Sequence, residues 1–191
     1  MATAPLFTGL IASAVERRPP RIAWWIGAAI AFAGEAVVVA VRDPAGGRAA
    51  TLAGDLLALG ACLGSGASYV AGARLTATIG SWAATFWAVN IASLVQAPFV
   101  ALLWSRTDWS GIGPAGWAAL LHLTYGTTVI AFLPWLWALA RGGIARVAVL
   151  QFAQPVIGLG LAALLLGERI TLPLLAAAAG ILAGIAIARR R

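Results

Sequence analysis

The sequence predicts an all-α protein: a polytopic bundle of membrane-spanning helices. Hydrophobic residues make up 62% of its 191 residues, and charged residues only 10%. The apolar residues also form long runs, separated by short segments with arginine, glycine or proline. Average soluble domains are about 45–50% apolar and about 25% charged. This composition therefore excludes a soluble enzyme and a disordered chain.

The positive charge does not indicate a nucleic-acid interface. All 13 basic residues are arginines, and the formal net charge is +7. A nucleic-acid footprint needs basic residues clustered on one face or along one groove. Here they lie singly or in short groups between apolar runs, as in membrane proteins. We therefore expect the lipid bilayer, and no nucleic acid, as the surroundings of the chain.

The apolar runs predict the helices directly. A bilayer core of about 30 Å needs about 20 apolar residues in a helix. Such runs predict seven helices, at residues 2–15, 22–41, 52–73, 80–104, 115–140, 145–166 and 171–188. Strands are not expected, because no ten-residue alternating segments are present. The first run is too short to span at about 1.5 Å per residue. We interpret it as a truncated helix, since no basic residue precedes it as in a signal peptide.

Arginine counts in short loops predict the orientation of the bundle. One side would hold Arg17, Arg18, Arg21, Arg74, Arg141, Arg146, Arg189, Arg190 and Arg191. The other side would hold Arg42, Arg48, Arg106 and Arg169. This asymmetry predicts a cytoplasmic C-terminus in a bacterial cytoplasmic (inner) membrane.

The chain contains an internal repeat with a shift of 150 residues. The shift places Pro5 on Pro155 and Gly34 on Gly184, and both copies carry a Glu-Arg pair between their helices. The copies lie an odd number of helices apart, so they would be inverted in the membrane. Inverted repeats are typical of secondary transporters. The second copy has three helices before its Pro155 pair, and the first copy lacks them.

Several segments then resemble one transporter family. They are 126–135, 138–146, Gln154-Pro155, 164–171 with Gly167-Glu168-Arg169, the opening 3–17, and 54–58. Together they resemble the EamA-type transporters of the drug/metabolite transporter superfamily. The resemblance implies a ten-helix, five-plus-five inverted-repeat fold. Residues 1–41 would be the last two helices of a truncated first repeat, 42–51 a linker, and 52–191 a complete second repeat.

The resemblance implies a transporter or exporter of small metabolites or drugs, working by alternating access, with no cofactor and no enzymatic activity. Its partners would be a small-molecule solute and either a second copy of the chain or the missing N-terminal helices. One alternative stays open: a non-transporting assembly partner, or half of a split transporter. A seven-helix photoprotein is disfavoured, because a retinal Schiff base needs a lysine amine.

Polar residues within apolar helices are candidates for the solute pathway. Gln151 and Gln154 lie three residues apart, and Pro155 removes a backbone donor and frees carbonyl groups toward a cavity. Ser68, Tyr69 and Tyr125 are further candidates at similar depth, and Asn90 is a candidate within the run 80–104. The plainer interpretation of each is a hydrogen bond between helices, worth about 0.6 kcal/mol on average.

Charged residues form a second group of candidates. Glu35 lies well inside the run 22–41 and is either a carboxylate that couples transport to protons or a protonated glutamate bonded to a neighbouring helix. Asp55 complements a helix dipole. Glu16, Glu168 and Arg169 are family-motif positions that interfacial pairing also explains. His122 lacks neighbouring ligands for a metal.

Overall fold

The computed structural model describes residues 3–42 and 51–190, and all regular structure in these ranges is helical. The helices divide into two compact units, residues 1–70 with 142–191 and residues 71–141, and each is described by itself. Some sequence-based expectations fall outside the described residues. They are the linker 42–51, apart from its two end residues, and two arginines of the orientation count, Arg48 and Arg191.

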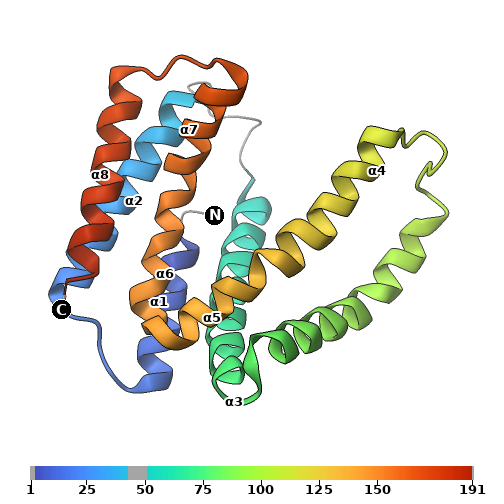
Figure 1. Ribbon diagram of the computed structural model, residues 1–191, viewed down its shortest axis with the longest axis horizontal. Helices are drawn as coiled ribbons and strands as arrows, with labels where there is room; N and C mark the ends of the chain where they lie inside the picture. Colours follow the sequence, from blue (N-terminus) through green and yellow to red (C-terminus); the bar gives the residue numbers. More distant parts are fainter. Residues whose placement is uncertain (1–2, 43–50, 191) are drawn as a thin grey trace. The chain divides into compact units, whose positions relative to one another are not determined.

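The first unit contains two helix pairs and the start of a long helix (Figure 1). Its elements are α1 (Ala4–Glu16), α2 (Ile22–Arg42), the first part of α3 (Leu52–Trp104), α6 (Ile144–Ala148), the 3₁₀ segment η2 (Val149–Ala153), α7 (Gln154–Leu166) and α8 (Leu172–Ala188). α1 packs against α6 and η2, and α2 packs against α8 and η2. The core joins residues from α2, η2, α7 and α8.

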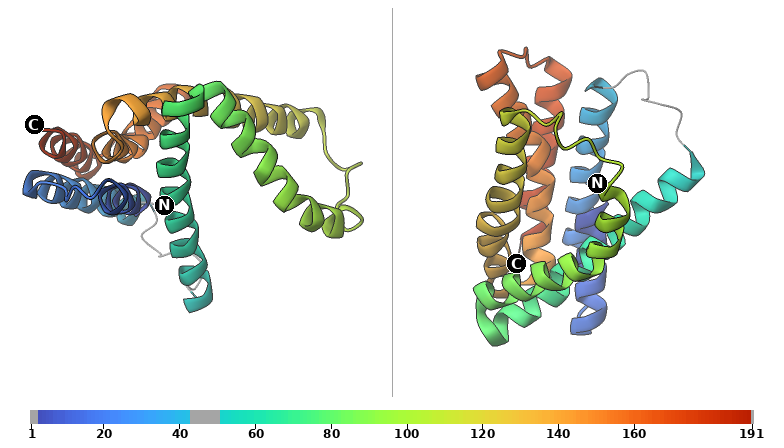
Figure 2. Two further views of the ribbon diagram at one scale, coloured as in Figure 1. Left: turned by 90° about the horizontal axis from the view of Figure 1, so that it is seen from below. Right: turned by 90° about the vertical axis from the view of Figure 1, so that its right-hand side faces the viewer.

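Small residues hold α2 and α8 together. The two helices run antiparallel side by side (Figures 1 and 2). A Cβ added at Gly184 would lie 2.5 Å from the Gly27 carbonyl oxygen and 2.6 Å from the Ala31 nitrogen. A Cβ at Gly34 would likewise meet Ala177 and Ile181. Only residues without bulk at these positions permit such a close approach.

These contacts are reciprocal under the 150-residue shift. Gly27 against Gly184 corresponds to Gly34 against Ala177, and Ala31 against Gly184 corresponds to Gly34 against Ile181. Antiparallel helices related by a local two-fold axis have contacts of this kind. Gly184 thus packs closely against α2 of the same unit. The Gly180-x-x-x-Gly184 spacing alone could not show this, because the same spacing is also compatible with contacts between separate helix bundles.

α3 is two helices joined at a sharp turn. Its 53 residues would reach about 80 Å, far more than one bilayer crossing requires. The helical path breaks at Gly80, which has φ 83° and ψ 159°. The end predicted for the helix 52–73 was therefore too early. Arg74 continues the helix, whereas the backbone conformation at Gly80 is open essentially only to glycine.

The second unit contains the rest of α3, α4 (Pro114–Leu121), the π-helix η1 (His122–Ile130) and α5 (Phe132–Gly142) up to Arg141. The uniform helix expected over 115–140 is thus interrupted. Pro134 explains the interruption, since it cannot donate to the carbonyl of Ile130 and its ring crowds that group. The amide of Ala131 instead donates to the carbonyl of Gly126, five residues back, at 3.0 Å.

Among the described residues, four helical stretches are long and apolar enough to cross a bilayer. They are Ile22–Arg42, Leu52–Trp104, Pro114–Gly142 and Ile144–Leu166. α1 and α8 are shorter apolar helices. Many large apolar side chains on these helices are exposed, which suits contact with lipid chains or other helices rather than water.

Candidate functional site

The clearest irregularity in the first unit is the 3₁₀ segment before Pro155. Proline has no amide hydrogen, so it cannot satisfy the Gln151 carbonyl, four residues back, in the α-helical manner. The amide of Gln154 donates to that carbonyl instead, in the tighter 3₁₀ pattern. Pro155 therefore rewinds the helix, and the carbonyl that was expected to be free is already bonded.

The side chain of Gln151 is the notable polar group of this segment. The residue is half-buried, and its Oε1 atom is shielded from solvent without a hydrogen-bond partner. Its neighbours Val149 and Phe152 are fully buried in the core. An unsatisfied buried acceptor costs about 1–3 kcal/mol. Gln154 lies one turn further and is exposed, and Pro155 is half-buried.

Two candidates on α3 belong to the same unit. The Ser68 hydroxyl donates to the Ser65 carbonyl of its own helix at 2.9 Å and is exposed, so it is satisfied locally. Tyr69 is half-buried.

Asn90 and Tyr125 belong to the second unit. The Nδ2 atom of Asn90 donates to the Phe86 carbonyl one turn earlier, at 2.8 Å. Tyr125 lies on the π-helix η1 and is 61% exposed. Thr127 and Thr128 both donate to the carbonyl of Leu123, at 2.6 and 3.0 Å.

The second unit also contains a cavity of about 320 Å³ beside the Gly80 turn. Its lining includes Thr76, Ser81, Trp137 and Arg141. Thr76 is 8% exposed, and its hydroxyl has no hydrogen-bond partner. The Arg141 guanidinium lies 5.0 Å from the centroid of the Trp137 ring, a cation–π contact.

Sequence reasoning missed this cavity, because it assigned Arg141 only to the orientation count. The cavity joins two stretches about 60 positions apart, which periodicity cannot pair. Gly80 was the one local signal, since a glycine between two apolar runs marks a turn.

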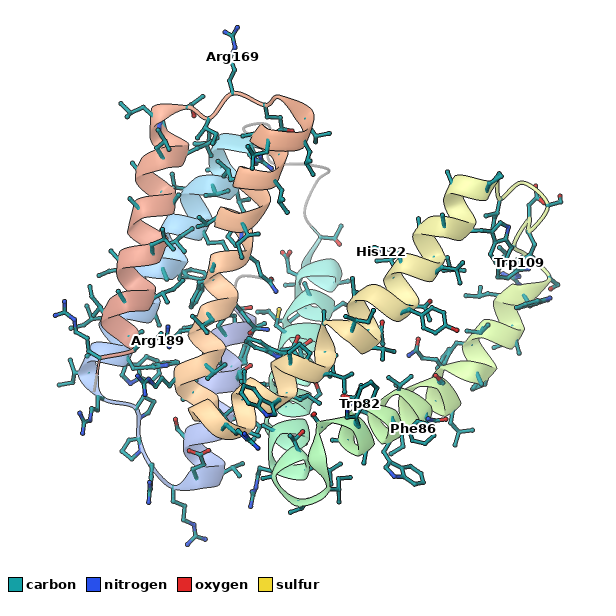
Figure 3. The ribbon with its side chains drawn as sticks, in the orientation of Figure 1. Trp82, Phe86, Trp109, His122, Arg169 and Arg189 are labelled. Atoms are coloured by element: carbon teal, nitrogen blue, oxygen red, sulfur yellow. The ribbon has the colours of Figure 1, made fainter. Side chains whose placement is uncertain are left out.

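The charged candidates lie mostly at helix ends. Asp55 is in the first turn of α3 and is exposed, and Glu16 is the exposed last residue of α1. Glu168 pairs with Arg42 at 2.7 Å and not with its neighbour Arg169, which points away from the helices (Figure 3). The pair ties the end of α2 to the connection between α7 and α8.

Glu35 lies within α2 and is half-buried. Arg42–Glu168 is the one salt bridge among the described residues, so Glu35 has no ion-pair partner there. The described residues also contain no group of three or more His, Cys, Asp or Glu side chains that could hold a metal ion.

Several apolar helices of spanning length define a polytopic α-helical membrane protein. Residues 52–190 match the EamA-like transporter family. The chain belongs to this family and is an integral membrane protein.

One curated relative extends the similarity over most of the chain. The "Uncharacterized transporter YdeK" of Bacillus subtilis (strain 168) is 31% identical over 186 residues, which cover 97% of this chain. The same residues cover 63% of that relative, so the chain spans less than two thirds of its length. No solved structure matches the chain.

Proposed function

We propose that the chain is a secondary transporter or exporter of small metabolites or drugs, working by alternating access. The observation that carries this proposal is the 3₁₀ segment of Ile144–Leu166, where Gln151 holds a buried, unpartnered acceptor. Transporters build substrate sites where membrane helices are interrupted. A solute donor that reaches Gln151 would satisfy an acceptor that the fold leaves without a partner.

The reciprocal contacts of α2 and α8 support the same proposal. They fit two inverted copies, with residues 1–41 from the first repeat and 52–191 from the second. Alternating access is a rocking of such copies about a central site. In this arrangement Gln151, Gln154 and Pro155 line the pathway with Tyr69, and Ser68 contributes only through its helix. In the second unit, taken by itself, Tyr125 is a further pathway candidate, and Asn90 contributes only through its helix. Glu35 is the proposed coupling carboxylate.

Counterflow in proteoliposomes tests the proposal. The probes are radiolabelled amino acids for the metabolite class and ethidium for the drug class. We expect Gln151→Leu to abolish accumulation of the transported probe. Gln96→Leu is the matched control, because Gln96 is also a glutamine within a membrane helix but lies on the second half of α3. Equal loss in both variants, or no accumulation of any probe by the unaltered chain, contradicts the proposal.

A second candidate function is the alternative left open above: a non-transporting assembly partner, or half of a split transporter that other helices complete. Those helices would come from a longer form of the chain, from a second copy in a homodimer, or from a separate subunit. The flux assay separates the two functions, because a component of this kind carries no flux when it is reconstituted alone. Flux by the purified chain alone contradicts this second function.

A further inference from the structure

A basic pocket lies at one end of the first unit. It is lined by Pro20, Arg21, Trp24, Ala145, Arg146, Ala188, Arg189 and Arg190 and has a volume of about 160 Å³. Three separate stretches meet there: the α1–α2 connection with the first turn of α2, the start of α6, and the end of α8. Figure 3 shows Arg189 at this end of α8.

The floor of the pocket is apolar and fixed. Trp24 is 4% exposed, and its indole Nε1 donates to the carbonyl of Ala145 at 3.0 Å, which ties α2 to α6. A Cβ at Gly9 would collide with the Trp24 ring, so α1 holds the same indole from another side. Ala188 is also buried. The pocket is thus a built feature with a rigid base rather than a chance gathering of mobile side chains.

Among the residues that the structure describes, the rim of the pocket carries four arginines and no carboxylate. All four are exposed, and none of them forms a salt bridge within the described part of the chain. Glu16, the last residue of α1, is the nearest acidic residue in sequence and makes no ion pair there either. At the other end of the same unit, by contrast, Arg42 is neutralised by Glu168. The four guanidinium groups therefore repel one another unless an external anion joins them.

Phosphate is the anion that suits this arrangement best. Guanidinium groups bind phosphate oxygens through paired, charge-assisted hydrogen bonds. The pocket also lies at the end of membrane helices, next to Trp25, which is 43% exposed and stacks edge-on with Trp24 at 5.0 Å. Tryptophan in this position is typical of the membrane–water interface. Basic pockets between membrane helices bind lipid headgroups, with the acyl chains along apolar surface.

We propose that this pocket binds the phosphate of an anionic phospholipid headgroup. Arg21 just before α2, Arg146 in α6 and Arg189 just after α8 hold the phosphate. Binding therefore clamps these three helices together at one end. The binding does not depend on the transported solute or on flux.

Lipid retention by the purified full chain tests the proposal. Native mass spectrometry is run after titration with phosphatidylglycerol or with zwitterionic phosphatidylcholine. We expect retention of phosphatidylglycerol. In the triple variant Arg21→Gln, Arg146→Gln, Arg189→Gln, affinity should fall at least about tenfold, the scale of one lost charge-assisted hydrogen bond. The control Arg74→Gln, Arg106→Gln, Arg169→Gln loses the same charge elsewhere and should bind within about twofold of the unaltered chain, since those arginines lie outside the pocket.

Two further arms make the outcome decisive. Arg146→Lys with Arg189→Lys keeps the charge but loses the paired geometry, so it should bind more weakly than the unaltered chain even if the triple variant does not fold. Excess inorganic phosphate should not displace the lipid, because free phosphate lacks the apolar contacts with the membrane-facing helices. Displacement by phosphate, equal retention of both lipids, unchanged binding in the lysine variant, or equal loss in the control variant would overturn the proposal.

Discussion

At the scale of single residues, glycines decide how closely membrane helices approach. Gly180 and Gly184 lie one turn apart on α8 and differ only in their surroundings. A Cβ at Gly184 would meet the backbone of α2, whereas nothing lies within 4 Å of a Cβ at Gly180. The backbone cannot yield as a flexible side chain would. The two positions are therefore a matched pair for substitution.

We expect Gly184→Ala to destabilise the protein and Gly180→Ala to stabilise it or leave it unchanged. Overpacking a tight contact costs about 1–3 kcal/mol, whereas an alanine gains about 1 kcal/mol of helix propensity over glycine. The free energy of unfolding in mixed micelles, titrated with denaturing detergent, measures both variants. Losses of equal size would show that the α2–α8 contact is not close in the membrane.

Asp108 determines the conformation of the connection between α3 and α4. Its carboxylate accepts hydrogen bonds from the Ser110 hydroxyl at 2.6 Å and from the amides of Ser110 and Gly111, each at 3.1 Å. These bonds, the Ser110 hydroxyl first, lower the pKa of Asp108 below its ordinary value.

The lowered pKa of Asp108 predicts a pH-dependent loop. The carboxylate stabilises the turn at pH values above the ordinary aspartate pKa, and this contribution is lost as the pH falls through the lowered pKa. Amide hydrogen exchange at Ser110 and Gly111 should therefore become less protected on acidification, after correction for intrinsic rates. Asp108→Asn should show weak protection at neutral pH as well. If the protection of these amides stays constant as the pH is lowered, the Asp108 carboxylate does not stabilise the turn.

At the scale of secondary structure elements, the turn in α3 depends on one residue. Gly80 has a positive φ and an extended ψ, a combination that costs a residue with a side chain about 1–3 kcal/mol. We expect Gly80→Ala to lower the thermal unfolding temperature followed by circular dichroism. Gly64→Ala, in the regular part of the same helix with open space around it, should not. A melting temperature unaffected by Gly80→Ala would mean that the two halves of α3 do not turn there.

The sequence predicted most helices but not their internal irregularities. Apolar run lengths located the helices to within a few residues, because the bilayer fixes the length of a span. The 3₁₀ and π segments were not predicted, although each is followed by a proline: Pro155 follows the 3₁₀ segment and Pro134 follows the π-helix. Each proline removes the donor for the carbonyl four residues earlier, and the neighbouring turns rewind to compensate.

The candidate site was less predictable than the helices. Gln151 was selected for its polarity and depth, but the lack of a partner for its Oε1 follows from tertiary packing. The cavity beside Gly80 and the basic pocket both combine side chains from distant stretches. Arg146 and Arg189 entered the sequence argument only as charges on one side of the membrane, since no periodicity joins α6 to the end of α8.

At the scale of the whole molecule, the arginine asymmetry predicts orientation. Ser110 lies in the connection on the side with fewer arginines, and Arg190 lies on the side with more. With Cys62→Ala as background, Ser110→Cys should react with a membrane-impermeant maleimide in intact bacteria, and Arg190→Cys only after permeabilisation. The reverse pattern would place the C-terminus outside the cell.

The 3₁₀ segment also changes how a helical wheel represents the longest apolar helix of the first unit. Each residue turns the chain by about 120° in a 3₁₀ helix and by about 100° in an α-helix. Over the five residues Val149–Ala153 the difference accumulates to about a quarter turn. A single helical wheel drawn through Ile144–Leu166 therefore places the side chains of α7 at the wrong angle about the helix axis relative to those of α6. Lipid-facing and protein-facing positions on either side of Gln151 have to be plotted on two wheels, offset by that angle.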